Sequence, residues 1–523
     1  MIERDPKYYT TGYTGEDPYR APFYLRSLVF DNEGGDLNTQ LVDEFNRLLQ
    51  KNKRFQKKRL MLDERISGRL PERIIVINAS HDNLPTSYET ARIFEDYCGE
   101  KGYLIPAKVV NRKEELEKEL EASPEKTLLI SQCVDKNVYN SRMAEELERR
   151  GTVIVPGKIT APGSIFSDKD STYRLLSDGG RDWSKVARYR KISAEDKEIA
   201  DVVDGIFQAV AELENETGKN TFFVKPHEGG GGLGGFRITK TGKGYIIPDL
   251  SKVSGRVSEI HPTFIDFDVT KRAKLRELLW VYRLFKADEK MTANYLKVDL
   301  PVSASDEEAM DVLRDYILNS KEKRDRKLAG MVLDEKEARG QLVEAIGIFE
   351  KKFARKYIPL VNEHIDFGLW GLRAHYRLSG RGPVLETIYH RVFQLAFTEE
   401  GLGYLGSDNI SNKQTGDLEI TRLGPVNEIM LESIGGKEAL FSILLEGAEA
   451  LVSLAELSAE EERYYIPLRL QLDLAAISRR IGEGNADTAR GLCLASRWTE
   501  FVRNAREWLK DSLRYYAWKK ERG

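Results

Sequence analysis

The chain has 523 residues, of which 41% are hydrophobic and 32% are charged, a balance typical of globular proteins and not of disordered ones. At roughly 100–200 residues per domain, this length predicts about three domains or one large enzyme with several lobes. Lysine and arginine total 81 and aspartate and glutamate total 84, which gives a net charge of −3. Broad nucleic-acid binding therefore lacks an electrostatic basis, and we expect no nucleic-acid partner.

The three cysteines lie far apart, at Cys98, Cys133 and Cys493, which argues against a disulfide framework and against a multi-cysteine zinc module. The beginning of the chain, MIERDPKYYTTGYTGEDPYR, lacks the apolar core of a signal peptide, and no apolar run is long enough to cross a membrane. We therefore expect a cytoplasmic protein with no membrane partner. Whether it forms a homo-oligomer is left open.

The N-terminal 70 residues predict an irregular arm followed by a helix. Residues 1–36 are rich in Tyr, Gly, Pro and Asp, whereas apolar residues from Leu41 to Leu49 recur at helical spacing. The basic cluster Lys51–Arg59 has two interpretations, a phosphate patch or, more commonly, a solvated helix face. We expect residues 1–70 to contain only this arm and this amphipathic helix.

From Arg73 onward, short β-branched runs alternate with helical segments, and the runs are RIIVINAS, YLIPAKVV, TLLIS and TVIVP. Strands and helices alternating at this spacing predict a three-layer α/β unit with a parallel sheet over residues 71–165. His81 and Asp82 follow the first strand, where parallel sheets tend to bind ligands, although a plain turn is an equally good interpretation.

Residues 166–261 predict an α+β region in which a helix over Glu195–Asn215 leads into the strand TFFVKP. Residues 262–355 are strongly charged and have helical periodicity throughout, which predicts an inserted helical subdomain. Strand patterns return after residue 356, and the end of the chain is helix-rich. The fold class is therefore α/β.

The strongest functional signal is Thr221–Thr239, TFFVKPHEGGGGLGGFRIT, with six glycines at positions 229–232, 234 and 235. Glycines this dense let backbone N–H groups approach an anion with no Cβ in the way. No GK[ST] ending and no helix follow, so neither usual phosphate motif matches. Because another strand follows, we expect a hairpin with a glycine tip over a phosphate, the alternative being a mobile surface loop. Lys225, at the end of the strand before the glycines, carries a point charge that suits such a phosphate, whereas Lys191 alone would be an unremarkable surface lysine.

The order DKDSTYRLL (Asp168–Leu176), RYRK, a strand ending in FVKP and a glycine-rich hairpin resembles the ATP-grasp superfamily, above all its glutathione-synthetase-like branch. This resemblance covers residues 70–250 and 356–500. It implies a three-layer pre-ATP-grasp domain (71–165), then a two-lobed α+β ATP-grasp domain (166–261 and 356–523) with the helical insertion 262–355. It also implies ATP and Mg²⁺ as cofactors, with a small-molecule carboxylate and an amine as substrates.

The resemblance further implies site residues. The nucleotide would contact Lys191, Lys225, Glu228, Gly230, Gly231, Gly232, Gly234, Asn362 and Glu363. IPLVNEHI (Ile358–Ile365) is similar to the hinge strand, whose backbone would read adenine while Glu363 accepts the ribose hydroxyls. Arg373, Arg391 and Asn409 would act on the transferred phosphoryl and acyl groups, and Arg377 belongs to the same segment.

Members of this superfamily hold Mg²⁺ with an acidic residue on one strand and a Glu-x-Asn on the next, oxygen ligands that suit this hard cation. Two placements compete here. Asp473, Glu483 and Asn485 have the right order, although GEGNADTARG lacks the apolar character of a central strand. Glu386 of VLETIYHR is the alternative, but no asparagine follows it two residues later. We favour the first placement; if neither holds, the metal site is degenerate.

The leading interpretation is an ATP-dependent carboxylate–amine ligase, which forms a C–N bond through an acyl phosphate. Such chemistry requires positioning and charge neutralisation and no covalent nucleophile. Two alternatives stay open: a small-molecule kinase on the same fold, and a nucleotide-binding regulatory protein with a degenerate metal site.

Overall fold

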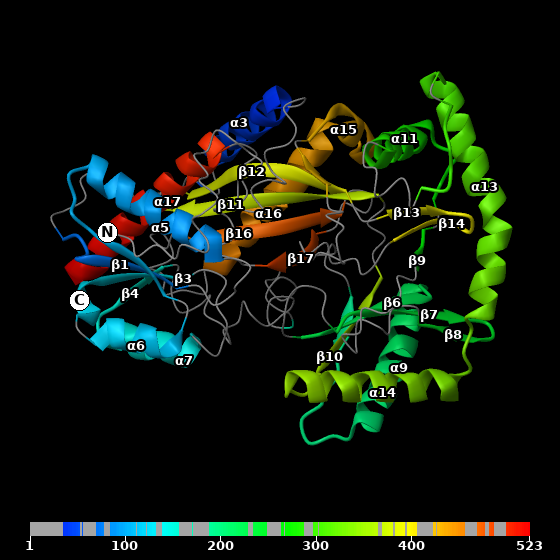
Figure 1. Ribbon diagram of the computed structural model, residues 1–523, viewed down its shortest axis with the longest axis horizontal. Coiled ribbons are helices and arrows are strands. Elements are labelled where there is room, and N and C mark those ends of the chain that lie inside the picture. The colour runs from blue at the N-terminus through cyan, green and yellow to red at the C-terminus, as the bar shows by residue number, and fades with distance from the viewer. Residues whose placement is uncertain are drawn as a thin grey trace.

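In the computed structural model, the described residues form four β-sheets and the helices that cover them (Figure 1). The residues that it describes are 35–52, 55, 69–77, 84–110, 112–121, 123–131, 139–155, 170, 188–227, 234–247, 263–265, 267–286, 296–301, 303–364, 369–379, 382–392, 395–404, 422–424, 426–455, 468–475, 481–485 and 498–522. Parallel and antiparallel sheets both occur, so the predicted mixed α/β class is confirmed.

The first sheet is parallel, with strand order β2-β1-β3-β4. Its strands are β1 (Arg73–Ile77), β2 (Ala107–Val110), β3 (Thr127–Ser131) and β4 (Val153–Val155), and its helices are α5 (Leu84–Glu100), α6 (Lys113–Glu121) and α7 (Ser141–Arg149). Ile74 and Val76 pack in a core with α5, whereas Ile75 and Ile77 pack in a second core with α6 and α7. Alternation along β-branched strands thus lets helices cover both faces.

The last helix of the chain, α17 (Trp498–Arg522), packs against α5 of this first unit. The Trp508 and Phe94 ring centroids are 5.7 Å apart, and the Arg506 guanidinium donates to both Glu100 carboxylate oxygens, at 2.9 and 2.6 Å. Residues from the two ends of the chain therefore share one core, and α17 lies beside the first unit in Figure 1.

The second sheet is antiparallel, with strand order β5-β10-β6-β7-β8. Its strands are β5 (Tyr189–Lys191), β6 (Thr221–Pro226), β7 (Phe236–Thr241), β8 (Gly244–Ile246) and β10 (Pro359–Glu363), and α9 (Ile199–Thr217) and α14 (Glu335–Phe353) cover one face. Val224 and Val361 pack there with Ile206 of α9 and Ile346 of α14. We call this sheet with its two helices the first lobe.

The charged block 262–355 supplies α11 (Arg272–Lys286), α13 (Asp306–Gly330) and α14. Although the charge and the helical periodicity of this block predict one insertion, its helices pack against two different sheets. The apolar side of α14 completes the core of the first lobe. In contrast, α11 and α13 pack on the small sheet β13-β14-β9, made of Leu395–Thr398, Gly401–Tyr404 and Thr263–Phe264, where the Phe397 ring meets Tyr282 at 5.6 Å.

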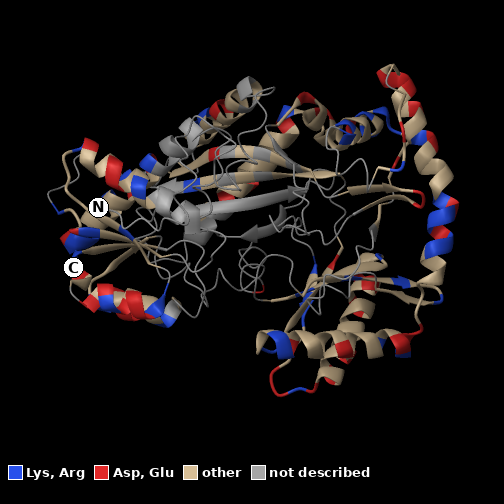
Figure 2. Cartoon of the chain, in the orientation of Figure 1, with Lys and Arg blue, Asp and Glu red and all other residues tan. Residues whose placement is uncertain are grey.

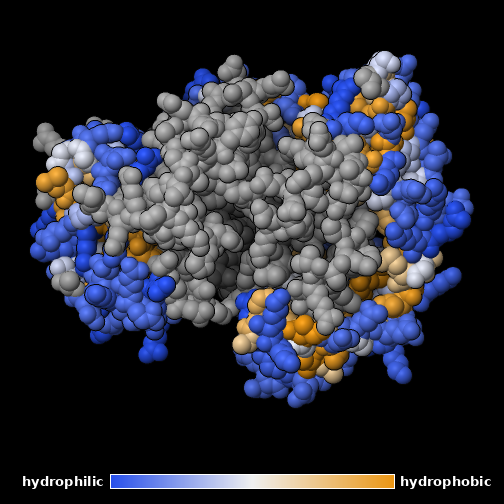
Figure 3. All heavy atoms as spheres, viewed as in Figure 1, coloured by the Kyte–Doolittle hydropathy of each residue, from blue (hydrophilic) through white to orange (hydrophobic). Residues whose placement is uncertain are grey.

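Helix α13 is long and polar on most of its surface. A capping box of Ser305 and Glu308 begins it and three acidic residues occupy its first turn, which complements the helix dipole. Basic residues follow further along (Figure 2), and most of the helix is hydrophilic in the space-filling view (Figure 3). None of the described helices combines the length and the apolarity that a membrane span needs.

The large sheet is antiparallel, with strand order β15-β12-β11-β16-β17. Its strands are β11 (Trp370–Ser379), β12 (Gly382–Val392), β15 (Arg422–Gly424), β16 (Leu468–Ala475) and β17 (Ile481–Asn485). Helices α3 (Gly35–Lys51) and α16 (Lys437–Ala455) pack on it, and α15 (Glu428–Ile434) packs against α16 and α11. The Asn46 amide of α3 bonds the backbone N–H and C=O of Leu385, both at 2.9 Å. The amphipathic helix predicted near the N-terminus thereby becomes part of this sheet's core.

A buried ionic network ties α17 to the large sheet. Arg377 of β11 donates to Glu386 of β12 at 2.9 Å and to Asp511 of α17, and Arg514 lies 3.6 Å from the other Asp511 oxygen. These side chains are at most 11% exposed.

Asp511→Ala should lower the free energy of unfolding by about 3 kcal/mol or more, because it leaves two buried guanidinium groups without that carboxylate. Glu146→Ala, which removes an exposed partner of Arg149, is the matched control and should cost at most about 1 kcal/mol. Denaturant unfolding measures both changes. Equal losses in the two variants would contradict a stabilising role for the network.

Candidate functional site

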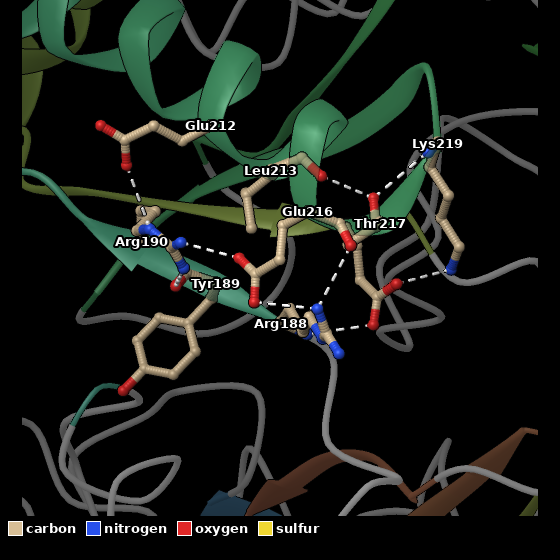
Figure 4. Close-up of polar contacts among 9 residues, drawn as sticks. Arg188, Tyr189, Arg190, Glu212, Leu213, Glu216, Thr217 and Lys219 are labelled. Atoms are coloured by element: carbon tan, nitrogen blue, oxygen red, sulfur yellow. Dashed lines mark hydrogen bonds and ion pairs between the residues drawn. The ribbon is translucent and has the colours of Figure 1, made fainter.

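The helix-facing side of the first lobe's sheet is apolar at its centre and ionic at its edge. Val224 of β6 and Val361 of β10 are cross-strand partners, and both lie in the core with α9. Arg190 of β5 pairs with Val361 and reaches α9, where it donates to Glu212 at 3.2 Å and to Glu216 at 2.7 Å (Figure 4). These contacts establish which residues of each strand face the helices.

The opposite side, which we call the polar face, carries the two lysines predicted to bind phosphate. Because side chains alternate along a strand, Lys191, Leu360 and Lys225 lie on this side. Leu360 of β10 is the cross-strand partner of both lysines. Lys191 on β5 and Lys225 on β6 therefore lie directly on either side of Leu360. With neighbouring strands about 5 Å apart, their Cα atoms are about 10 Å apart. Lys225 is only 6% exposed.

Asp170 borders the polar face along the edge strand β5. Its Oδ2 atom lies 3.0 Å from Lys191 Nζ, and its Oδ1 atom accepts a hydrogen bond from the Tyr189 hydroxyl at 2.9 Å. Asp170 is 3% exposed and belongs to the DKDSTYRLL segment. Asp170 of this segment therefore contacts Tyr189 and Lys191 of RYRK. Asp170 was not among the predicted site residues, since no local pattern indicates which strand it would contact.

Asn362 lies on the polar face two residues beyond Leu360. Its cross-strand partners are Tyr189 of β5 and Phe223 of β6. The side chain is 3% exposed, and neither its oxygen nor its nitrogen has a hydrogen-bond partner within the described part of the chain. The structure thus brings Lys191, Lys225 and Asn362, all predicted to bind the nucleotide, onto one face.

Glu363, predicted to accept the ribose hydroxyls, lies on the other side of the sheet. Its cross-strand partner Phe222 belongs to the helix-facing core. The Glu363 carboxylate forms an ion pair with Lys219 Nζ at 2.7 Å and accepts a hydrogen bond from the Arg188 backbone N–H at 3.1 Å. Figure 4 shows Lys219 and Arg188. A shift of one residue along a strand reverses the face. This position gives the ribose contact no support, and Glu363 instead ties β5, β6 and β10 together.

Strands β6 and β7 are antiparallel neighbours, with Val224 opposite Phe236, so the glycine-rich segment connects the two strands of a hairpin as predicted. Four of the residues predicted to cover the phosphates, Glu228, Gly230, Gly231 and Gly232, lie outside the described residues.

Gly234, the fifth, lies at the buried base of this hairpin. Its φ of +77° is one that side chains disfavour, and a Cβ there would come within 2.9 Å of Phe349 and 3.2 Å of Pro226. Its carbonyl accepts a hydrogen bond from the buried Tyr357 hydroxyl. Gly234 is therefore required by conformation and packing, and it anchors the hairpin.

Gly234→Ala should reduce the free energy of unfolding by about 2 kcal/mol or more, since it adds left-handed strain to steric overlap. Gly242→Ala, where an added Cβ meets nothing within 4 Å, is the control and should change stability by about 0.5 kcal/mol or less. Urea unfolding separates the two outcomes, and a Gly234→Ala protein as stable as the control would disprove the anchoring role.

The predicted catalytic and metal residues lie on adjacent strands of the large sheet. Arg373 of β11 is paired with Asp473 of β16, Gly371 of β11 with Arg391 of β12, and Gln471 of β16 with Asn485 of β17. Glu483 lies two residues before Asn485 on the edge strand β17. An edge position explains why GEGN need not be apolar, which was the objection to this placement. Asn409 lies outside the described residues.

Arg377 Nε donates to one carboxylate oxygen of Glu386 through the 2.9 Å bond described above. Glu386 and Asp511 hold the buried Arg377 guanidinium, and its place in the segment that would act on the γ-phosphate stays a prediction. A cation at Glu386 would have to displace that arginine, which favours the rival placement at Asp473. Among the side chains that the structure describes, no group of three or more His, Cys, Asp or Glu is arranged to hold a metal ion. The metal ligands stay a prediction.

No protein-family model and no curated protein matches the chain. Among solved structures, it is similar to D-alanine–D-alanine ligase from Bacillus anthracis, with 11% identity and a TM-score of 0.40 over 87% of this chain and all of that one. The D-Ala:D-Ser ligase VanG from Enterococcus faecalis is 11% identical with a TM-score of 0.40, and the match covers 85% of this chain and 99% of that one. Carboxyaminoimidazole ribonucleotide synthase from Aspergillus clavatus, complexed with ATP, is 7% identical with a TM-score of 0.36, and the match covers 83% of this chain and 77% of that one.

By their names, two of these neighbours are ligases and the third is a synthase. Because the identities and TM-scores are this low, no residue role is transferred from them.

Proposed function

We propose that this chain is an ATP-dependent ligase that activates a carboxylate as an acyl phosphate for attack by an amine. The observation that carries the proposal is the pair of lysines flanking Leu360, on a sheet face that leads into the glycine-rich hairpin. Lys225 is nearly buried, and a charge-assisted hydrogen bond from an ammonium group to a phosphate is stronger in a site with little water. The phosphates of ATP would lie between Lys191 and Lys225.

On the polar face, Lys225 and Asn362 are nearly buried whereas Lys191 is exposed, so a movement of the first lobe would open the inner part of this face to a nucleotide. The core of this lobe, around α9, α14 and their sheet, is separate from the core that includes the large sheet. Two cores that do not merge can move as units, as in enzymes that close over their substrates. This arrangement is consistent with nucleotide binding between the first lobe and the large sheet.

The proposed reaction has two steps. A carboxylate oxygen attacks the γ-phosphorus of ATP and ADP leaves; the amine then attacks the acyl carbon, loses a proton and expels phosphate. The lysines would neutralise the phosphates, and Arg373 and Arg391 would face the transferred group. Asp473, Glu483 and Asn485, which lie on the paired strands β16 and β17, would supply the oxygen ligands that Mg²⁺ prefers. Bound there, Mg²⁺ would stabilise negative charge on the phosphate oxygens.

The test combines ATP and Mg²⁺ with a panel of carboxylates, one labelled with ¹⁸O at a time, and a panel of amines. A ligase releases ADP only when both substrates are present, and one ¹⁸O atom passes from the carboxylate to inorganic phosphate. Release of ADP without an amine, with the phosphoryl group retained on the acceptor, would indicate a kinase instead. ATP binding without any turnover would indicate the regulatory alternative.

A further inference from the structure

Asp170 places a nearly buried carboxylate beside Lys191, one of the two lysines of the polar face. The Asp170 side chain is 4% exposed and the Lys191 side chain is 36% exposed. The Oδ2 atom of Asp170 accepts a hydrogen bond from Lys191 Nζ at 3.0 Å. Because an exposed ion pair is weak whereas a buried carboxylate is costly without its cation, Lys191 is held more firmly here than it would be at an open surface.

Tyr189 orients the Asp170 carboxylate. Its hydroxyl donates to the Oδ1 atom of Asp170 at 2.9 Å. Tyr189 and Lys191 lie two residues apart on β5, opposite Asn362 and Leu360 of β10, so both side chains are on the polar face. The two carboxylate oxygens therefore have different partners, and the contact of Oδ1 with Tyr189 presents Oδ2 to Lys191.

Lys191 has more conformational freedom to lose than Lys225. Lysine carries its ammonium group on a flexible four-carbon stem, and a ligand that binds the ammonium group must immobilise this stem. Lys225 is 6% exposed, so the surrounding protein already restricts it, whereas Lys191 belongs to the edge strand β5. An ammonium group has three N–H donors, and the bond to Asp170 uses one of them.

We propose that Asp170 is a positioning residue that holds the Lys191 ammonium group at the edge of the polar face for the phosphates of ATP. It acts through Lys191 and makes no contact with the nucleotide. Because Lys191 is fixed before ATP arrives, binding loses less side-chain entropy. The inference rests on the proposed function, since it requires phosphates on the polar face.

The experiment measures the dissociation constant of ATP by calorimetry for wild type, Asp170→Leu, Lys191→Ala and the double variant. Leucine has a shape similar to that of aspartate and no acceptor, so the buried site stays filled while both contacts of the carboxylate are lost. Asp170→Leu should weaken ATP binding about three- to tenfold, the cost of immobilising one long side chain. In the Lys191→Ala background the same substitution should weaken ATP binding no further, because the side chain that Asp170 positions is absent.

Lys219→Ala is the matched control. Lys219 Nζ forms an ion pair with Glu363 at 2.7 Å, and the two side chains are 36% and 5% exposed, almost as in the pair of Lys191 and Asp170. Glu363 faces the helices, on the opposite side of the same sheet, so the loss of this pair should leave ATP affinity unchanged. Asp170→Asn keeps an acceptor oxygen without the charge and should bind ATP more tightly than Asp170→Leu and less tightly than wild type.

Asp170→Ala, which cannot overfill the site, is a second variant with the same expected loss. Wild-type or tighter ATP binding in either folded variant would overturn the inference, since the carboxylate would then be neutral or repulsive toward phosphate. An equal loss in the Lys191→Ala background would overturn it too, because Asp170 would then act by some route other than Lys191. In those cases the proposed function still stands if Lys225→Ala weakens ATP binding. A wild type that does not bind ATP would overturn the proposed function and this inference together.

Discussion

Asp473→Asn should lower the rate of ATP-dependent product formation by about 10²-fold or more, while nucleotide affinity and stability stay near wild type. The substitution removes one negative charge from a set of oxygen ligands, and ligand charge governs the affinity of a hard cation. Asp473 is paired with Arg373 and lies beside β17, which carries Glu483 and Asn485. Steady-state turnover as a function of Mg²⁺ concentration measures the effect, and excess Mg²⁺ should restore part of the rate.

Glu386→Gln is the comparison, and we expect the opposite profile. Its carboxylate is held by Arg377, so the variant should lose stability and keep its turnover per folded molecule. If Asp473→Asn keeps full activity and Glu386→Gln has none, the metal ligand is Glu386 and not Asp473. Full activity in both would mean that the metal ligands lie elsewhere.

Lys225→Ala should weaken ATP binding by about 2–3 kcal/mol, or about 30–150-fold in dissociation constant. Lys225 is 6% exposed, so a phosphate near it would lose a charge partner in a site with little water. Calorimetric titration measures the change. Adenosine, which has no phosphates, should bind the variant as it binds wild type.

Arg190→Ala is the matched control for the lysine. Arg190 is a cation next to Lys191 on β5, but it faces α9 and contacts Glu212 and Glu216. Its loss should leave ATP affinity unchanged. Equal ATP affinity in wild type and a folded Lys225→Ala protein would rule out phosphate binding by Lys225.

Local patterns in the sequence predict the parts of this protein that local physics determines. The β-branched runs RIIVI and TLLIS form the parallel strands β1 and β3. The strand-like runs before and after the glycines form the β6–β7 hairpin. Lys191, Lys225 and Asn362 could be predicted as one group, because strand ends and a glycine-rich turn are visible in the sequence. That they share one face follows only from the register with β10.

What could not be predicted depends on register and on contacts between distant residues. Glu363 differs from Asn362 by a single position, yet it faces α9 because strand alternation reverses the side. The bond between Arg377 and Glu386 forms across a strand pair with an irregularity between His375 and Tyr376, which no sequence pattern reveals. The return of α17 onto α5 likewise depends on packing across almost the whole chain.

Hydrogen exchange with and without ATP and Mg²⁺ tests the central claim, that the nucleotide lies on the polar face under the glycine-rich hairpin. The peptides that decide it cover Thr221–Thr241 and Pro359–Glu363, because β6, β7 and β10 form that face. We predict that ATP slows exchange in both regions, and most strongly across the glycines, whose backbone N–H groups would bind phosphate. Tight ATP binding with unchanged exchange in both regions would contradict the account.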